Sequence, residues 1–345
     1  MEHLQIWGSF LVSAILIIFA GVKLTKYGDI LSERLNLGHA FIGAVLIGWS
    51  TSLPELVLSI GTAVYANAPN ITMGNVLGSN LFNIFIIVIL DIVYHQGAIL
   101  RSVEKKVSLS TILSLMMVCA VGTCLYLNVS GKIDISSIDL GFSKLGYDSV
   151  VIFSMYLICM VVLFRSDRGG AKADTVKKYD GITLGSVLLK CLFVIGIIVG
   201  TGLWLSDIAT DINRVYELDA GFVGSFFLAI VSSLPEVMTC FIAVRMGFNN
   251  MAIGTLFGSN VFNMGIIAFC DVFYPGHLFK QFNSSHYTGV IFVILLTFVT
   301  LGTLKFKQGK QAKFIGSESL LIAGLYLLGM YTIYDPSWLR MIFGS

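Results

Sequence analysis

Ten long stretches of apolar residues, separated by short polar segments, follow one another through this sequence. A helix needs about 20 mostly apolar residues to cross a bilayer, and each stretch has roughly that length. Only 12% of the residues are charged, whereas soluble domains average about 25%, so water is an unsuitable solvent for the folded chain. We therefore predict an all-α polytopic membrane protein. Its ten transmembrane helices are predicted at residues 5–24, 38–65, 70–94, 107–128, 147–165, 182–205, 220–246, 250–274, 287–304 and 315–334.

The lysines and arginines between the predicted spans indicate how the chain enters the membrane. Cytoplasmic loops of membrane proteins are enriched in these two residues. If the N-terminus lies outside, 16 of the 22 lysines and arginines fall in cytoplasmic loops, 5 fall on the opposite side, and Lys190 falls inside the sixth span. This bias favours both termini being extracellular or periplasmic. We expect a multi-pass protein of a bacterial or archaeal plasma (inner) membrane.

Two short motifs occur twice in the chain. Ser-Leu-Pro-Glu at 52–55 returns at 233–236, and Gly-Ser-Asn-x-Phe-Asn at 78–83 returns at 258–263. The order is the same and the spacing nearly so, which indicates an internal duplication. Because each half holds an odd number of spans, the halves must have opposite orientations in the membrane. Inverted repeats with helices broken at the midplane are typical of secondary transporters.

The duplication divides the chain into two five-helix repeats. The first covers residues 1–165 and contains its motifs within 48–83. The second covers 182–345 and contains its motifs within 229–263. Between them, a cytoplasmic linker at 166–181 is charged, contains glycine and is too short for a folded regulatory domain.

Each Ser-Leu-Pro-Glu motif predicts a break within a span. Proline lacks an amide hydrogen and clashes with the preceding helical turn, but it suits the first turn of a new helix. We expect the chain to unwind near 48–52 and 229–233 and to restart as a helix at each proline. The break frees main-chain carbonyls and places Glu55 and Glu236 in the first turn of a half-helix, where the helix dipole favours a carboxylate.

The two glutamates favour an ion site over a simple proline kink. An ionised side chain at the centre of a bilayer costs about 2.5–3.5 kcal/mol even on the most lenient scale. Inverted symmetry can bring Glu55 and Glu236 together, and two carboxylates repel each other unless a cation lies between them. We therefore predict a cation or proton site, with a purely structural polar network as the weaker alternative.

Oxygen-bearing side chains accompany both glutamates. Calcium takes 6–8 oxygen ligands, whereas zinc, copper and nickel favour the His and Cys residues that both motifs lack. Two carboxylates neutralise one divalent or two monovalent cations, so calcium and sodium could compete for one site. The glycines fit close packing of helices, an alternative that also applies to the repeated Ser and Asn residues. The candidate ligands are Glu55, Glu236, Thr51, Ser52, Ser232, Ser233, Ser79, Asn83, Ser259 and Asn263.

The repeated motifs resemble the two α-repeats of the sodium/calcium exchangers, within the cation/calcium antiporter superfamily. The resemblance rests on 50–55 with 78–83 and on 231–236 with 258–263, and the ten-span layout extends it to nearly the whole chain. It implies a secondary antiporter that exchanges Na⁺ for Ca²⁺ by alternating access. It also implies that one glutamate of each repeat shares the calcium ion with main-chain carbonyls.

The resemblance further implies how the ligands are grouped. Calcium would use the carbonyls of Thr51 and Ser232, and Asn83 and Asn263 would line the middle of the site. The implied sodium sites combine Glu55, Ser79, Thr51 and the Gly48 carbonyl on one side, and Glu236, Ser259, Ser232 and the Ala229 carbonyl on the other. Many archaeal and potassium-dependent relatives have Asp where this chain has Asn263, so we expect transport without a requirement for potassium.

Other functions remain open from the sequence. The main alternative is an antiporter of H⁺ and Ca²⁺, or of another divalent cation, because paired glutamates can exchange protons for a metal. A cation channel fits inverted repeats less well, and no zinc motif or serine–histidine pair supports an intramembrane enzyme. We expect no enzymatic activity, cofactor, nucleic acid or obligatory protein partner. The expected partners are Ca²⁺, Na⁺ and the lipid bilayer.

Overall fold

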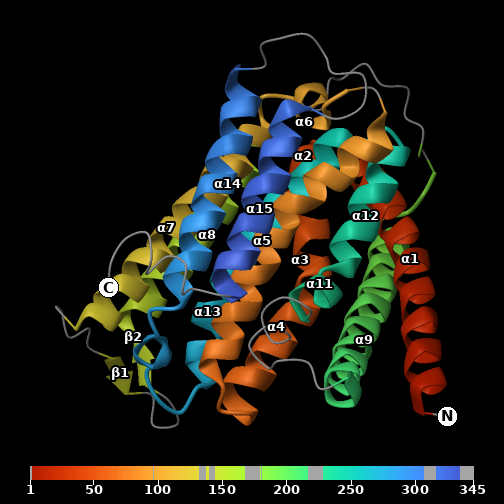
Figure 1. Cartoon of the computed structure of the whole chain (residues 1–345). Helices are drawn as coiled ribbons and strands as arrows, with labels where there is room; N and C mark the ends of the chain where they lie inside the picture. Colours follow the sequence, from red (N-terminus) through yellow and green to blue (C-terminus); the bar gives the residue numbers. More distant parts are fainter. Residues whose placement is uncertain are drawn as a thin grey trace.

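The described part of the chain is almost entirely helical. The computed structural model describes residues 2–95, 97–131, 137–139, 144–167, 179, 181–216, 228–306 and 316–334. The long helices run alongside one another in a single bundle (Figure 1). Eight of the described helical segments are long and apolar enough to cross a membrane.

The first repeat forms five rods, of which the second is divided into short pieces. Charged residues such as Lys23 end the first apolar run but not the first helix, because lysine is itself a good helix former. The rods are α1 (Glu2–Leu35); α2 (His39–Phe41), the π-helix η1 (Ile42–Ile47), α3 (Gly48–Thr51), α4 (Leu53–Ile60) and the π-helix η2 (Gly61–Tyr65); α5 (Pro69–Tyr94); α7 (Val107–Ser130); and α8 (Tyr147–Asp167). A short helix, α6 (Ile99–Ser102), follows α5, and a hairpin of β1 (Ser137–Asp139) and β2 (Lys144–Gly146) precedes α8.

The second repeat follows the same order. It consists of α9 (Leu184–Tyr216), α11 (Leu228–Ser232) with α12 (Leu234–Arg245), α13 (Asn249–Phe273), α14 (His286–Phe306) and α15 (Ser317–Tyr334). A short 3-10 helix, η4 (Leu278–Gln281), follows α13 as α6 follows α5.

The prediction of ten transmembrane helices in two inverted sets is confirmed by this order. The predicted first span ends too early, because α1 continues to Leu35, whereas the predicted sixth span, 182–205, agrees with the membrane-length segment Leu184–Trp204 of α9. Residues 220–227 of the predicted seventh span lie outside the described residues, as does most of the linker 166–181. The domain boundaries drawn through that linker therefore stay a prediction.

The two central helices, α5 and α13, contact each other and most of the remaining bundle. The apolar window of α13 is 83% buried inside the protein and that of α5 is 78% buried, against 28% for α1. By contrast, α1 packs mainly on α9 at one side of the bundle, which is the right side of Figure 1. The repeated motif residues 78–83 and 258–263 thus lie at the centre of the protein, where lipid cannot reach them.

Close backbone contact brings α13 against the broken second rod. A Cβ atom added to Gly258 would collide with the main chain of Ala44, and one added to Gly43 would collide with the main chain of Met251. Only glycine permits two helices to approach this closely. The packing role expected for the glycine of the second motif copy is therefore confirmed at Gly258.

Matching aspartates anchor the ends of the central helices to the opposite repeat. Near the end of α5, Asp91 accepts hydrogen bonds from Ile99 N (2.7 Å), Gly316 N (3.1 Å) and Ser319 Oγ (2.6 Å), and so joins α5 to the start of α15. Near the end of α13, Asp271 accepts from Leu278 N (2.7 Å) and Gly146 N (2.8 Å), and so joins α13 to the start of α8. Each central helix is thus fixed to the last helix of the other repeat.

Candidate cation site

The two predicted breaks occur at equivalent serines. Ser52 separates α3 from α4 with φ −91° and ψ 4°, and Ser233 separates α11 from α12 with φ −87° and ψ 7°. The expected unwinding over 48–52 and 229–233 is wrong in extent, because residues before each break form a helical turn. A proline near the start of a helix removes only one hydrogen bond of the preceding turn, so one residue suffices for the interruption.

The half-helices after the breaks hold the two glutamates as expected. Proline lies within the first two positions of both α4 and α12, and Glu55 and Glu236 lie in the first turns of those helices. Their side chains are buried, with 1% and 0% of their surface exposed. The carboxylates interact electrostatically with each other, and neither forms an ion pair with a basic side chain in the described part of the chain.

Each carboxylate hydrogen-bonds to the break of the opposite repeat. Ser52 Oγ donates to Glu236 Oε1 at 2.8 Å, and Ser233 Oγ donates to Glu55 Oε1 at 3.3 Å. Ser259 Oγ lies 3.4 Å from the same Glu236 oxygen and 3.1 Å from the Gly48 carbonyl oxygen. The two broken rods therefore cross so that the glutamate of one faces the hydroxyl groups of the other.

This crossing changes the expected grouping of ligands. The resemblance combined Glu236 with residues 229 and 232 of its own half, whereas the structure places it against Ser52, Ser259 and the Gly48 carbonyl. The contact of Glu236 with Ser259 agrees with the expected set, and the grouping of the ligands around a bound ion stays a prediction. A side chain in the first turn of a helix projects away from the break before it and toward the neighbouring rod.

The hydroxyl groups of Thr51 and Ser232 bond to their own helices. Thr51 Oγ1 lies 3.0 Å from the Ile47 carbonyl oxygen and 3.2 Å from that of Gly48, and Ser232 Oγ donates to the Ala229 carbonyl oxygen at 3.2 Å. A hydroxyl group that donates in this way keeps its lone pairs for other partners. Both side chains are fully buried, and their role as ligands stays a prediction.

Paired asparagines join the two central helices beside the glutamates. Asn80 Nδ2 donates to the Asn260 carbonyl oxygen at 3.3 Å, and Asn260 Nδ2 donates to the Asn80 carbonyl oxygen at 3.4 Å. Asn83 Nδ2 donates to Asn260 Oδ1 at 3.0 Å. Neither Asn80 nor Asn260 was among the candidate site residues, although both recur at the same position of the repeated motif.

Several buried oxygen atoms of this layer have no hydrogen-bond partner. A buried polar atom without a partner costs about 1–3 kcal/mol, whereas a hard cation such as calcium or sodium is bound by oxygen ligands of this kind. The layer is formed where α4, α5, α12 and α13 contact one another. The unpartnered oxygens are Glu55 Oε2, Glu236 Oε2, Ser79 Oγ, Asn80 Oδ1, Asn83 Oδ1 and Asn263 Oδ1.

The donor set suits a hard cation that has two carboxylate ligands. No group of three or more His, Cys, Asp or Glu residues able to hold a metal occurs among the described residues. The remaining ligands must therefore be neutral hydroxyl, amide or carbonyl oxygens. Two negative charges with neutral oxygens around them suit a divalent cation or a pair of monovalent ones.

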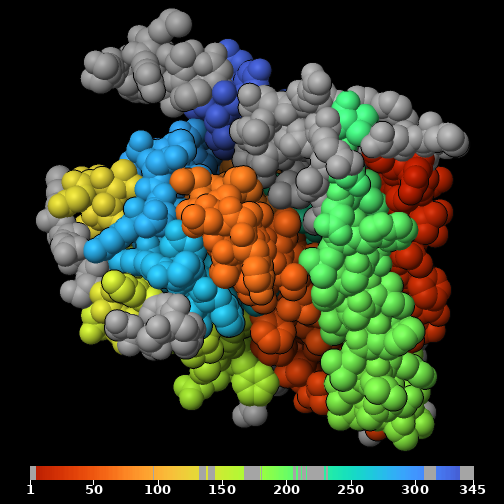
Figure 2. All heavy atoms as spheres, turned by 90° about the horizontal axis from the view of Figure 1, so that it is seen from below, coloured from red at the N-terminus to blue at the C-terminus, as the bar shows by residue number. Residues whose placement is uncertain are grey.

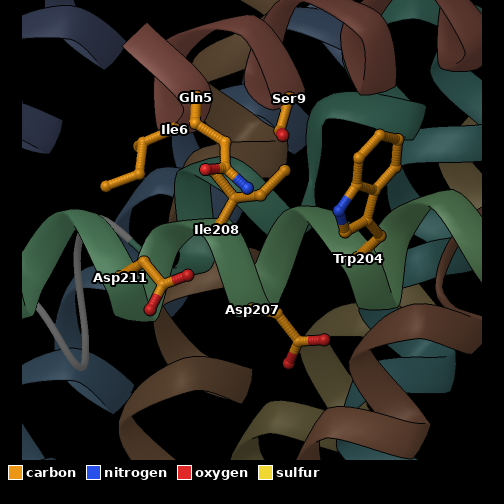
Figure 3. A pocket seen from close by; sticks show the side chains of 7 residues that line it. All are labelled: Gln5, Ile6, Ser9, Trp204, Asp207, Ile208 and Asp211. Atoms are coloured by element: carbon orange, nitrogen blue, oxygen red, sulfur yellow. The ribbon is translucent and has the colours of Figure 1, made fainter. Parts of the chain in front are cut away.

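A separate cavity of about 300 Å³ lies between α1 and α9, away from the glutamates. Figure 3 shows that its lining comes from these two helices only. Its carboxylates, Asp207 and Asp211, are not fully buried. The cavity is lined by Gln5, Ile6, Ser9, Trp204, Asp207, Ile208 and Asp211.

Comparison with known proteins gives one consistent family. The model of the family described as "Sodium/calcium exchanger protein" matches residues 5–165 and 185–334. The inner membrane protein YrbG of Escherichia coli is 24% identical over 340 residues, covering 96% of this chain and 97% of that protein. The sodium/calcium exchanger MaX1 of Methanosarcina acetivorans is 22% identical over 312 residues, covering 80% and 86%.

A solved structure has the same fold. The sodium-calcium exchanger NCX_Mj, soaked with Na⁺ and Sr²⁺, superimposes with a TM-score of 0.72 at 20% sequence identity. The match covers 96% of this chain and 99% of that one. Both broken rods fall within the residues that the family model matches.

Proposed function

The chain belongs to the sodium/calcium exchanger family, and from that premise we propose that it exchanges Na⁺ for Ca²⁺ across the membrane by alternating access. The observation that carries the proposal is the pair of reciprocal contacts in which Ser52 binds Glu236 and Ser233 binds Glu55. These contacts use one oxygen of each carboxylate and leave the other without a partner. We further propose an inner-membrane location with both termini outside, as the name of the E. coli relative and the lysine and arginine bias suggest.

Charge balance supports exchange at one shared site. Two carboxylates at a buried position are strongly disfavoured without compensating positive charge. One Ca²⁺ supplies that charge, and so do two Na⁺ ions. The site with either kind of ion bound is therefore electrically neutral. An empty site carries two uncompensated charges, and it should not pass a dry barrier. Because only a loaded site can cross the barrier, the protein should exchange ions and should not let them leak.

The geometry supports one calcium position between two flanking sodium positions. The first sodium position lies at Glu236 with Ser52, Ser259 and the Gly48 carbonyl, whose oxygens are grouped within hydrogen-bond distance. The second is its symmetric counterpart at Glu55 with Ser233, Ser79 and the Ala229 carbonyl. Calcium would take the free carboxylate oxygens of both glutamates, with Asn83 and Asn263 beside it.

Alternating access fits the way in which the helices are joined. The Asp91 and Asp271 anchors tie the central helices to α15 and α8, and so hold the core together. The pair of α1 and α9 lies outside these two anchors and packs against the crossed rods, where Asp29 of α1 lies 3.0 Å from His39 Nε2 of α2. We propose that this pair moves along the core and exposes the cation site to one face at a time.

Sodium as the coupling ion is the finer part of the proposal. Protons need only the two carboxylates, whereas sodium needs several oxygen ligands, and the neutral oxygens of Ser79, Asn83 and Asn263 supply them. Reconstituted vesicles would test this with ⁴⁵Ca²⁺ uptake driven either by an outward Na⁺ gradient or by an outward H⁺ gradient, at clamped voltage. We expect uptake with the Na⁺ gradient and none above background with the H⁺ gradient. The opposite result would assign the chain as an H⁺/Ca²⁺ antiporter, and E236Q serves as the inactive control for both arms.

A further inference from the structure

The first repeat contains a column of buried polar side chains that leads from Glu55 toward one face of the protein. Along α4 and η2 the column consists of Glu55, Ser59 and Thr62, which lie about one helical turn apart. Ser59 is fully buried and Thr62 is half-buried. The connection at 66–68 follows, where Asn67 is exposed.

The facing helix, α5, carries a matching column. Thr62 Oγ1 lies 2.7 Å from Thr72 Oγ1, which fixes how the two antiparallel helices are aligned. One turn toward the site, helical periodicity puts Ser59 and Asn75 at the same level. One further turn puts Glu55 and Ser79 at the same level. The polar side chains therefore form three levels between the cation site and the surface.

The middle level is unsatisfied. Asn75 is 1% exposed, yet neither its Oδ1 nor its Nδ2 has a hydrogen-bond partner, and the same holds for Ser59 Oγ. At the outer level, by contrast, Thr62 and Thr72 bond to each other and lie 3.2 and 3.3 Å from the Ser59 carbonyl oxygen. Buried amides without any partner are rare in proteins, and a bound water or ion is one way in which such groups are satisfied.

The second repeat lacks this level. The repeat offsets of 181 and 180 residues make Cys240 the counterpart of Ser59, and Thr255 the counterpart of Asn75. Cys240 Sγ donates to the Ala252 carbonyl oxygen at 3.4 Å, and Thr255 Oγ1 donates to the Met251 carbonyl oxygen at 2.9 Å. The outer level is replaced by two alanines, at 243 and 252. The polar column is thus a property of one repeat and of one side of the site.

The column points to the face that carries the N-terminus, at the bottom of Figure 1. Figure 2 views the molecule from that side and shows the corner of η2 and α5, in orange, between α9 in green and the segment from η4 to α14 in light blue. At this corner Asn70 Nδ2 donates to the Gln281 carbonyl oxygen at 3.2 Å. Along α4, η2 and α5, the Thr62–Thr72 level lies between the unsatisfied groups and this face.

We propose that Ser59 and Asn75 form a further station for a partly hydrated monovalent cation, Na⁺, between the central site and the N-terminal face; the identity of the ion rests on the proposed exchange function. Asn75 Oδ1 and Ser59 Oγ are neutral oxygen ligands, which suit a single positive charge better than a divalent ion. Asn75 Nδ2 cannot bind a cation, but it can donate to a water molecule that the ion retains. The station lies one turn from Glu55, so an ion can pass to the carboxylate after a short step.

Equilibrium binding of ²²Na⁺ to the purified protein tests the station without any transport. We expect N75L and S59A to bind one Na⁺ fewer per chain than the wild type. The matched variant T255V, at the equivalent place in the second repeat, should bind as many as the wild type. In vesicles of known orientation, N75L should raise the half-saturating Na⁺ concentration about tenfold on the N-terminal face and leave it unchanged on the other face.

Thermal unfolding in sodium-free buffer separates this role from a structural one. Leucine has the same number of side-chain heavy atoms and the same branching as asparagine, and it removes polar groups that already lack partners, so N75L should unfold at the wild-type temperature or above it. Unchanged Na⁺ binding in N75L, or a lowered unfolding temperature without sodium, would overturn the station. Wild-type vesicles could show no sodium-driven calcium uptake while N75L still binds one Na⁺ fewer than the wild type. That result would contradict the proposed exchange function and support the Na⁺ station.

Discussion

Asn80 and Asn260 each donate their side-chain amide to the main-chain carbonyl of the other, at 3.3 and 3.4 Å. The reciprocity shows that a local two-fold axis passes between α5 and α13 at this point. These two side chains join the central helices without any ion. Asn83 and Asn263, about one helical turn further on, keep side-chain oxygens without a hydrogen-bond partner, and so does Asn80.

The two glutamates are expected to act as one unit. E55Q and E236Q should each reduce calcium exchange to about the level of protein-free vesicles, because a cation loses a charged ligand in either case. ⁴⁵Ca²⁺/Ca²⁺ exchange measures this without reference to the coupling ion. D207N, which alters an exposed carboxylate of the cavity between α1 and α9, should retain wild-type exchange. Near wild-type exchange by either glutamine variant would contradict the site assignment.

Potassium should not be required for transport. Asn263 gives the site a neutral amide in place of a third carboxylate, so no extra monovalent cation is needed for charge balance. Calcium uptake at a fixed Na⁺ gradient and clamped voltage should be the same in K⁺ and in choline. N263D adds a negative charge and should make uptake depend on an additional monovalent cation. A strong potassium dependence of the wild type would show that the inference from Asn263 is wrong.

Gly258 should tolerate no side chain. G258A places a methyl group against the main chain of Ala44 and must push α13 away from η1, at an expected cost of about 1–3 kcal/mol in the free energy of unfolding. The matched control is G61A, because a Cβ at Gly61 meets no atom within 4 Å and the residue has ordinary helical φ and ψ. Unfolding temperatures in detergent should fall for G258A alone.

The carboxylate anchors should contribute to stability and not to ion selectivity. D91A removes the acceptor for three hydrogen bonds and leaves two buried amides unpaired, so we expect a loss of about 3 kcal/mol or more in the free energy of unfolding. D271A should behave in the same way. The folded fraction of each variant should have the same half-saturating Ca²⁺ concentration as the wild type. A selective loss of calcium affinity with unchanged unfolding temperature would instead place these aspartates in the transport path.

Exchange should be obligatory, with the site open to one face at a time. Calcium efflux from loaded vesicles should be slow in choline and fast when Na⁺ or Ca²⁺ is added outside. S52C and S233C should change their reactivity with a membrane-impermeant thiol reagent in opposite senses when the conformation is biased. The native background is favourable, since Cys119 alone of the six cysteines is exposed and can be replaced first. Labelling of one molecule from both faces, or rapid uncoupled leak, would indicate a channel.

The sequence predicted the spans and the glutamates because both follow from local rules. The length of the apolar stretches predicts the transmembrane helices. A proline followed by a glutamate places Glu55 and Glu236 in the first turn of a half-helix. The crossing of the rods could not be predicted, because it depends on how residues about 180 positions apart pack together. Asn80, Asn260 and the two aspartate anchors were visible as repeated residues. The partners of the aspartates in the opposite repeat, such as Ser319 for Asp91, carry no motif.

The exchange of partners between the two breaks makes each repeat incomplete by itself. A single half expressed alone would lack the serine of the opposite break, which binds its glutamate, and the carboxylate that accepts from its own serine at the break. Two copies of one half could complete each other only if they entered the membrane in opposite orientations. The arrangement therefore fits descent from a short protein of dual topology that worked as an antiparallel homodimer. Fusion of two such copies would then have allowed the column of Ser59 and Asn75 to arise in one half without appearing in the other.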